Sequence, residues 1–190
     1  MKTKKTIFIL FIILVIIQLV SPLKMIYNQE NTLKKGKPYK FLTQPIDPSD
    51  PFRGKYIRLN YKIRSYKTLD SIWSRNDKIY VYLKDSIGYA KIDTVCKQKV
   101  NTKKDYVIAK VKWYSSYNKK LSFNLPFNRF YMEESKAKPA EDLVRRNRRD
   151  TINTNTTYAL VYLDEDSYVL DNVFVNNVAI KEVIQNQKNK

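Results

Sequence analysis

The sequence contains no histidine and a single cysteine, Cys96, among its 190 residues. Without histidine, Ser-His-Asp triads, Cys-His pairs and most zinc sites are excluded. A lone cysteine excludes an intrachain disulfide and a cysteine-based metal cluster, so we interpret Cys96 as a structural strand residue. Any catalysis would depend on serine with lysine, on paired carboxylates, or on tyrosine and arginine. The sequence thus predicts no metal site and no cofactor, and it identifies no catalytic residue.

Glycine is also scarce, with 3 residues against 15 tyrosines. This balance is typical of strands joined with few glycine turns. Apolar residues make up 43% and aromatic residues 13% of the chain, which is a globular composition. The length fits one domain with an appendage. A domain of about 150 residues buries roughly 68–70% of the surface that its unfolded chain exposes, so it can fold without disulfides.

Acidic residues are the minority among the charged ones: 18 Asp and Glu stand against 36 Lys and Arg, giving a net charge of +18. Such a field attracts anionic lipid headgroups, acidic envelope polymers or nucleic acid. The alternative is a solvated surface without a dedicated ligand, because the basic residues are scattered along the chain. One tight run, in residues 145–149, ends a short helix predicted near 139–149. There the arginines either complement the helix dipole or contact an anion.

Residues 6–26 are predicted to form a transmembrane anchor. No charged residue lies between Lys5 and Lys24, and this stretch is near the shortest helix that crosses a hydrocarbon core of ~30 Å. The lysines of the basic start, residues 1–5, indicate a cytoplasmic N-terminus and an extracytoplasmic domain. A cleaved signal peptide would share this pattern. Because no A-x-A-like cleavage site follows, we favour a retained single-pass anchor in the cell membrane.

The rest of the chain divides into a polar tether at 27–37, a β domain at 38–185 and a polar tail at 186–190. The apolar and alternating segments predict strands at 39–44, 56–65, 79–83, 89–96, 107–113, 121–124, 158–163 and 168–175. Asn176 and Asn177 predict a two-residue hairpin turn into a last strand through Ile184, because Asn tolerates positive φ. We therefore predict an all-β fold, a curved antiparallel sheet that is barrel-like or sandwich-like, with one short helix.

The segment 56–65 has the clearest period of two. Its apolar residues at 57, 59, 61 and 63 alternate with Arg58, Asn60, Lys62 and Arg64. A strand with this pattern has one buried face and one solvated face. The solvated face is predicted to be basic.

The stretch 45–61 reads P-I-D-P-S-D-P-F-R-G-K-Y-I-R-L-N-Y. Its two Asp-Pro steps favour consecutive turns before the strand. It resembles the signature of the GDYXXLXY family, whose members carry a run similar to P-x-D-P-x-D-x-x-R-G-D-Y-x-x-L-x-Y soon after an N-terminal membrane segment. The matching residues are Pro45, Asp47, Pro48, Asp50, Arg53, Gly54, Tyr56, Leu59 and Tyr61. Residues 128–134, N-R-F-Y-M-E-E, are similar to an aromatic-then-Glu segment of the family.

The resemblance has one departure, because Lys55 stands where the family has aspartate. A reversed charge at a catalytic acid would abolish activity, so this position is expected at a surface or interface. The resemblance implies no reaction. It implies a complex, since family members accompany multi-pass membrane proteins. The residues that it predicts for binding are Asp47, Asp50, Arg53, Tyr56, Tyr61 and Glu133.

Two functional hypotheses follow. The first is a non-enzymatic envelope module that docks on a multi-pass membrane protein, an anionic lipid or an envelope polymer. The alternative is a membrane-tethered hydrolase of peptide or glycan, using a Ser-Lys dyad or carboxylates such as Asp50 and Glu133. A nucleic-acid partner is not expected, because the domain is predicted to face away from the cytoplasm.

Overall fold

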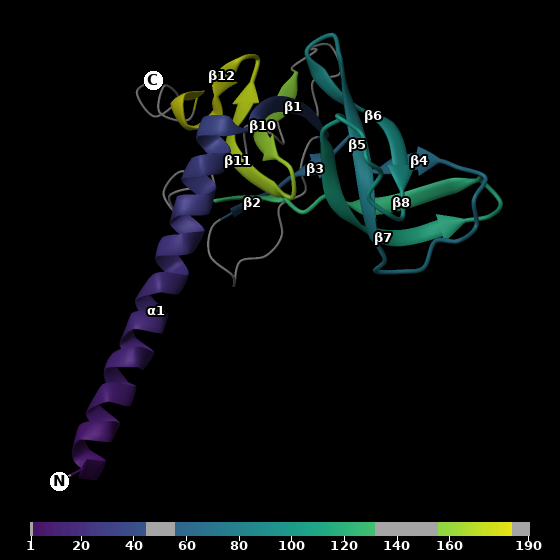
Figure 1. The fold of residues 1–190 in the computed structure, drawn as a ribbon. Coiled ribbons are helices and arrows are strands. Elements are labelled where there is room, and N and C mark those ends of the chain that lie inside the picture. The colour runs from purple at the N-terminus through teal and green to yellow at the C-terminus, as the bar shows by residue number, and fades with distance from the viewer. Residues whose placement is uncertain (1, 45–55, 132–155, 184–190) are drawn as a thin grey trace.

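The computed structural model of the chain describes residues 2–44, 56–131 and 156–183. One long helix, α1 (Lys2–Lys35), projects from a domain of β-strands (Figure 1). The all-β fold class and the long apolar N-terminal helix predicted from the sequence are both confirmed. The short helix predicted near 139–149, with its arginine run, and the tail at 186–190 lie outside the described residues.

The described strands are β1 (Lys37–Gln44), β2 (Tyr56–Arg58), β3 (Asn60–Tyr61), β4 (Ser65–Lys67), β5 (Lys78–Ser86), β6 (Tyr89–Cys96), β7 (Tyr106–Ser115), β8 (Lys120–Asn124), β9 (Arg129–Tyr131), β10 (Thr157–Asp164), β11 (Ser167–Val175) and β12 (Val178–Ala179). One five-stranded sheet has the order β12-β11-β10-β1-β3, and the other has the order β4-β8-β7-β5-β6. The short strands β2 and β9 form a separate pair. All pairings between described strands are antiparallel.

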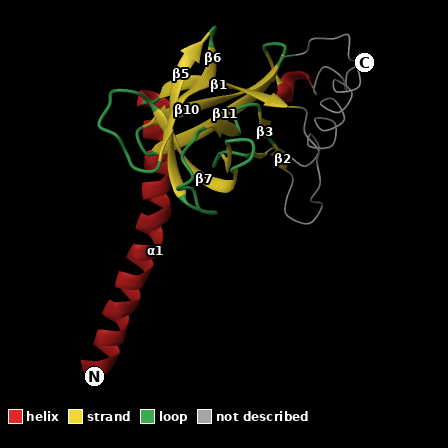
Figure 2. Ribbon diagram, turned by 90° about the vertical axis from the view of Figure 1, so that its right-hand side faces the viewer, coloured by secondary structure: helices red, strands yellow, loops and turns green. Residues whose placement is uncertain are grey.

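The two large sheets curve around one shared core and form a nearly closed barrel (Figure 2). At one seam β1 lies beside β6. Near this seam the Tyr39 hydroxyl donates a hydrogen bond to Asp105 at 2.7 Å, and Lys37 pairs with the same carboxylate at 3.0 Å. Burial and the neighbouring carboxylate raise the pKa of Tyr39 well above its ordinary value. The hydroxyl therefore remains a donor across the physiological pH range.

The first part of α1 is apolar on all sides, and its side chains are exposed from Ile7 to Tyr27 apart from the half-buried Val15. By length and composition this helix is able to cross a membrane. The helix continues beyond the apolar part through most of the segment predicted as a tether, and it ends at Lys35. Its last turns lie against β10 and β11, so the helix enters the domain without a loop between them.

Gly36 closes α1 and begins the turn into β1. Its N–H donates to the Thr32 carbonyl at 2.9 Å, which satisfies one of the free carbonyls at the helix end. A Cβ at this position would overlap the Thr32 carbonyl oxygen and would lie 3.0 Å from the Leu163 carbonyl oxygen of β10. Glycine is thus required here by the close approach of helix and sheet.

The hairpin predicted at Asn176 and Asn177 is confirmed. Both residues have positive φ, 51° and 65°, and they connect β11 to β12 with Val175 opposite Val178. A last strand through Ile184 is wrong, because β12 ends at Ala179 and residues 180–183 form a helical turn. This turn places Ile180 in the core with no exposed surface.

The single strand predicted at 56–65 is also wrong, although its alternation is confirmed from 59 to 64. Leu59 and Tyr61 are buried, while Lys62 and Arg64 are exposed. The segment is divided into three short strands: β2 pairs with β9, β3 with β1 and β4 with β8. The chain here crosses from one sheet to the other, so no single neighbour can pair with its whole length.

Candidate functional site

The motif residues Leu59 and Tyr61 belong to the core. They are 2% and 4% exposed, and the Tyr61 hydroxyl donates to the Phe127 carbonyl at 2.7 Å. The Tyr61 ring lies edge-on to Phe41 and Phe127, with centroids 5.8 and 5.3 Å away. Burial raises the pKa of Tyr61 far above its ordinary value. The Leu and the final Tyr of the motif thus hold the fold together, so Tyr61 has a structural role in addition to the binding role predicted for it.

The structure brings together the two segments that carried the family resemblance. In the β2–β9 pair, Tyr56 lies opposite Tyr131, with ring centroids 5.6 Å apart. The Arg129 guanidinium lies 5.1 Å from the centre of the Tyr56 ring, which is within the range of a cation–π contact. The Leu59 N–H donates to the Asn128 carbonyl at 2.8 Å. The sequence contained both segments, but it had no signal that they pair.

Of the six predicted binding residues, the structure describes Tyr56 and Tyr61. Asp47, Asp50, Arg53 and Glu133 lie outside the described residues, as does Lys55. Their role in binding therefore stays a prediction. The described part of the motif leads directly into a hollow on the surface of the domain, and this hollow is the candidate site.

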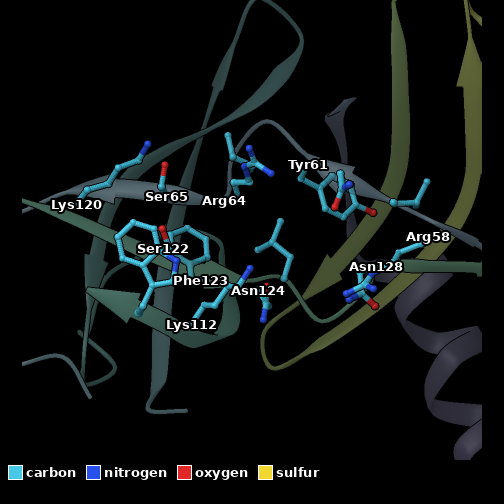
Figure 3. Close-up of a pocket in the computed structure, with 15 residues that line it drawn as sticks. Arg58, Tyr61, Arg64, Ser65, Lys112, Lys120, Ser122, Phe123, Asn124 and Asn128 are labelled. Carbon is cyan, nitrogen blue, oxygen red and sulfur yellow. The ribbon is translucent and has the colours of Figure 1, made fainter. Parts of the chain in front are cut away.

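The hollow is a pocket of about 360 Å³ between the segment from Arg58 to Ser65 and the strands β7 and β8 (Figure 3). Residues 59 and 61 form part of its wall, together with Phe123 and Leu125. Its neutral polar lining comes from the segment from Arg58 to Ser65, from β8 and from the chain just before β9: Asn60, Ser65, Ser122, Asn124 and Asn128. The size is within the range of about 300–1,000 Å³ that ligand pockets in proteins have.

Four basic residues line this pocket: Arg58, Arg64, Lys112 and Lys120. All four are exposed, and Figure 3 shows Lys120 and Arg58 at opposite ends with Arg64 between them. Among the described residues none of the lining side chains is acidic, and none of the four cations forms an ion pair. Guanidinium and ammonium groups gathered in this way bind phosphate, sulfate or carboxylate groups. We refer to this hollow as the basic pocket.

A β-bulge shapes one side of the basic pocket. The register of the β7–β8 pair shifts between Val111 and Trp113, so that Val111 lies opposite Phe123 and Trp113 opposite Ser122. Lys112 is the extra residue. In a regular strand, Lys112 and Trp113 would point to opposite faces of the sheet. Here both line the basic pocket, which is the kind of redirection that bulges produce.

Sequence reasoning identified only part of this site. The basic face predicted for the segment 56–65 contains Arg58, Asn60 and Arg64, which line the pocket, and Lys62, which does not. Lys112, Trp113 and Lys120 were missed as site residues, because strand pairing brings them across from β7 and β8. The alternation of cations with apolar residues at 58–64 was the available signal. It indicated the basic face of the segment 56–65, but it did not indicate that β7 and β8 form the opposite wall of the pocket.

The described residues offer few other chemical groups. Among them no cluster of His, Cys, Asp and Glu is suited to hold a metal ion, and Cys96 is a free, half-buried thiol on β6. Ser65 and Ser122 share the basic pocket with Lys112 and Lys120. A lysine that activates serine must be desolvated, whereas both of these lysines are exposed. The pocket is therefore better suited to bind an anion than to activate a serine nucleophile.

A second hollow of about 420 Å³ lies where α1 meets the domain. It is lined by Gln29 from α1, by Phe127, Arg129 and Tyr131 at β9, and by Tyr168 and Leu170 of β11. Tyr131 and Tyr168 are 62% and 42% exposed. This groove lies beside the part of α1 that follows its apolar stretch, where Gln29 is located.

A family model described as "GDYXXLXY protein" matches residues 18–170 of the chain. The match begins within α1 and extends into β11, so it contains both the motif segment and every residue that lines the basic pocket. No curated protein and no solved structure matches the chain significantly. The extent of the family match shows that the chain belongs to the GDYXXLXY family.

Proposed function

We propose that this protein is a membrane-anchored, non-enzymatic module that binds an anionic component of the cell envelope in its basic pocket. The observation that carries the proposal is the gathering of Arg58, Arg64, Lys112 and Lys120 around one hollow, with no carboxylate among the described lining residues. Like charges held close together repel each other. An anion that enters the pocket relieves this repulsion and makes charge-assisted hydrogen bonds with the same groups.

In this proposal α1 is the anchor. The lysines at its start favour a cytoplasmic N-terminus, so the β domain lies on the opposite side of the membrane. Because α1 is one continuous helix to Lys35, the distance from Lys24 to its end is about 17 Å at ~1.5 Å per residue. The headgroup region on each side of a bilayer is roughly 5–8 Å thick. The domain is thereby held close to the membrane surface, where anionic headgroups and envelope polymers are concentrated.

Docking on a multi-pass membrane protein is a second candidate, favoured by the groove beside α1. The exposed rings of Tyr131 and Tyr168 line this groove next to Gln29, and aromatic residues are enriched at membrane interfaces and at protein interfaces. Purification of the full chain from its native membranes in mild detergent tests this candidate. A stoichiometric multi-pass protein that stays bound in high salt would support it, and recovery of the chain alone would contradict it.

A hydrolase remains the competing hypothesis, through Asp50 and Glu133 or through a serine and a lysine. Hydrolysis of peptide or glycan by the purified chain that disappears in Glu133→Gln, with folding unchanged, would favour the hydrolase over the binding module. The same activity tested in Ser65→Ala and Ser122→Ala distinguishes the carboxylate from the serine mechanism.

The binding proposal is tested with the full chain in nanodiscs of phosphatidylcholine, which carries no net charge. The probe is inorganic polyphosphate, with affinity measured by calorimetry at two salt concentrations. We expect binding that weakens in salt. The double variant Arg64→Ala/Lys120→Ala should bind about tenfold more weakly, which is a loss of about 1.4 kcal/mol.

The matched control is Lys91→Ala/Lys103→Ala, which removes the same charge from exposed lysines outside the basic pocket. This control should change the affinity by less than about twofold, since screened surface charges act weakly over a distance. Equal weakening in both double variants would show that polyphosphate responds to the net charge of the domain, and the proposal would be wrong.

A further inference from the structure

We propose that the ligand of the basic pocket is an anionic glycan, in which sugar rings carry the negative groups, and that Trp113 is the surface on which a sugar ring stacks. This inference rests on the proposed function, because it names the class of anion that the same pocket takes. It depends on three features that a site for a simple anion does not need: an exposed indole, a row of neutral polar side chains and a volume much larger than one ion.

The first feature is Trp113, which is 44% exposed and lines the basic pocket. An exposed tryptophan at a polar site is unusual, because its large apolar surface is costly to leave in water. The bulge in β7 places this indole beside Lys112 in the same pocket. The C–H groups on one face of a sugar ring pack against the electron-rich face of an aromatic ring, while the neighbouring ammonium group is placed to meet an anionic substituent.

The second feature is the neutral polar lining. Asn60, Asn124, Ser65 and Ser122 all line the basic pocket. Within the described parts of the chain, none of their side chains takes part in a hydrogen bond. Amide groups and hydroxyls each offer both donors and acceptors. They suit the hydroxyl groups of a sugar, which also donate and accept, whereas phosphate or sulfate groups offer acceptors for the cations.

The third feature is size. A volume of about 360 Å³ is within the range of about 300–1,000 Å³ of pockets that hold small organic ligands. A single phosphate or carboxylate group would leave most of this space to water. A sugar residue with its charged substituent fills more of it, and it reaches the indole and the cations together.

Single-stranded nucleic acid also combines anionic groups with rings that stack. Sites for it use successive aromatic side chains along a basic groove, one for each of several bases. In the basic pocket, the exposed ring is that of Trp113, because Tyr61 and Phe123 are buried. An anchored domain outside the cytoplasm also faces glycans instead of nucleic acids. We therefore favour the glycan, and nucleic acid becomes an outcome of the test.

The test compares four probes on the full chain in phosphatidylcholine nanodiscs: dextran sulfate, neutral dextran, inorganic polyphosphate and a single-stranded oligodeoxynucleotide. Dextran sulfate and dextran share a glucose backbone and differ in charge, whereas polyphosphate has charge without rings. Trp113→Ala should weaken dextran sulfate binding about tenfold and leave polyphosphate binding unchanged within about twofold. Trp113→Phe should recover most of the loss, because it restores an aromatic face.

The control variant is Tyr117→Ala, which removes an aromatic ring that is 93% exposed and does not line the basic pocket. It should not change the affinity for any probe. If polyphosphate binding depends on Arg64 and Lys120 but Trp113→Ala leaves dextran sulfate binding intact, the glycan inference is overturned and the proposed function stands. If no polyanion binds, both fail. Tighter binding of the oligonucleotide than of dextran sulfate, with the same dependence on Trp113, would assign the pocket to nucleic acid instead.

Discussion

The two sides of the second sheet differ in how they use their charges. On the side of β5 and β6 two carboxylates pair with lysines: Asp93 lies 2.6 Å from Lys104 and 3.2 Å from Lys84, and Asp77, just before β5, lies 2.8 Å from Lys97. At β7 and β8, on the other side, Lys112 and Lys120 face Arg58 and Arg64 across the basic pocket. None of these four cations has a carboxylate partner within the described residues. One side holds carboxylates that pair with some of its lysines, whereas the described lining of the basic pocket holds no carboxylate.

The cations behind the net charge of +18 therefore lie in two kinds of surroundings, with and without carboxylates nearby. On the side of β5 and β6 the chain supplies acidic partners for some cations, Lys84, Lys97 and Lys104, but for Lys91 it supplies none within the described residues. Where they surround the basic pocket, it supplies none among the described residues, although repulsion between like charges lowers the stability of the compact state. In the function proposed above, a bound ligand carries the missing negative charge, which would explain why such a cluster is tolerated. The following predictions test whether the two sides differ in function or only in arrangement.

The largest effect is a loss of stability, expected where the pocket and the core meet. There Leu59 can be compared with its neighbour Arg58. Leu59→Ala should lower the free energy of unfolding by about 2–5 kcal/mol, because Leu59 is 2% exposed and its loss leaves a cavity. Arg58→Ala should change the stability by no more than about 0.5 kcal/mol, while it weakens polyphosphate binding. Urea unfolding of the full chain in detergent, followed by tryptophan fluorescence, measures the first quantity.

A result in which Arg58→Ala destabilises the domain as much as Leu59→Ala would break the comparison. Arg58 would then be a structural residue, and the basic pocket would be a by-product of folding. Unchanged stability together with weakened binding would show that Arg58 acts on the ligand and not on the stability of the fold.

The next largest effect is an increase in the stability of the domain when its ligand binds. An anion that binds the folded domain but not the unfolded chain raises the free energy of unfolding by about 2.7 kcal/mol at 100 times its dissociation constant. Polyphosphate should therefore raise the Tm of the wild-type chain. At the same concentration it should raise the Tm of Arg64→Ala/Lys120→Ala much less. Without polyphosphate this double variant should be at least as stable as wild type, because two repelling charges are gone.

The matched variant Lys91→Ala/Lys103→Ala sharpens this result. It should show the wild-type increase in Tm, since neither lysine lines the basic pocket. Equal increases in all three proteins would mean that polyphosphate stabilises the domain through its general charge. The difference between the two sides of the sheet would then have no bearing on ligand binding.

Much of the fold could be predicted because it depends on local pattern. Alternation predicted most of the strands, and the Asn176–Asn177 turn was recognised because its backbone requires positive φ at both positions. The apolar run predicted the first part of α1. The helix extends further than the apolar run because its last turns lie against β10 and β11, and tertiary packing of this kind has no local signature.

The site was less predictable, for a related reason. The face of Arg58 and Arg64 follows from alternation, but a pocket needs a second wall, and that wall is set by which strands become neighbours. The division of the segment 56–65 into β2, β3 and β4 gives each piece a different partner. The bulge that turns both Lys112 and Trp113 toward the pocket is a feature of strand pairing, and nothing in the order of residues 110–115 indicates it.

The smallest effect is expected on the paired side, at Asp93, and its pH dependence separates it from the basic pocket. Hydrogen bonds from Lys104 and Lys84 hold the pKa of Asp93 below its ordinary value, which is about 3.9 in an unfolded chain. A lowered pKa in the folded state gives stability that is present above this value and is lost as the pH falls through the folded pKa. Asp93→Asn should therefore be less stable than wild type at pH 7, and the gap should close on acidification below about pH 4. No carboxylate lines the basic pocket among the described residues, so the difference between Arg64→Ala/Lys120→Ala and wild type should stay constant from about pH 7 to about pH 3. Melting curves at a series of pH values in constant salt measure both differences. If the difference in stability between Asp93→Asn and wild type is also constant with pH, the ion pairs of Asp93 do not contribute to the stability of the fold. Neither the paired charges nor those of the basic pocket would then stabilise the domain, and the two sides of the sheet would be alike in this respect.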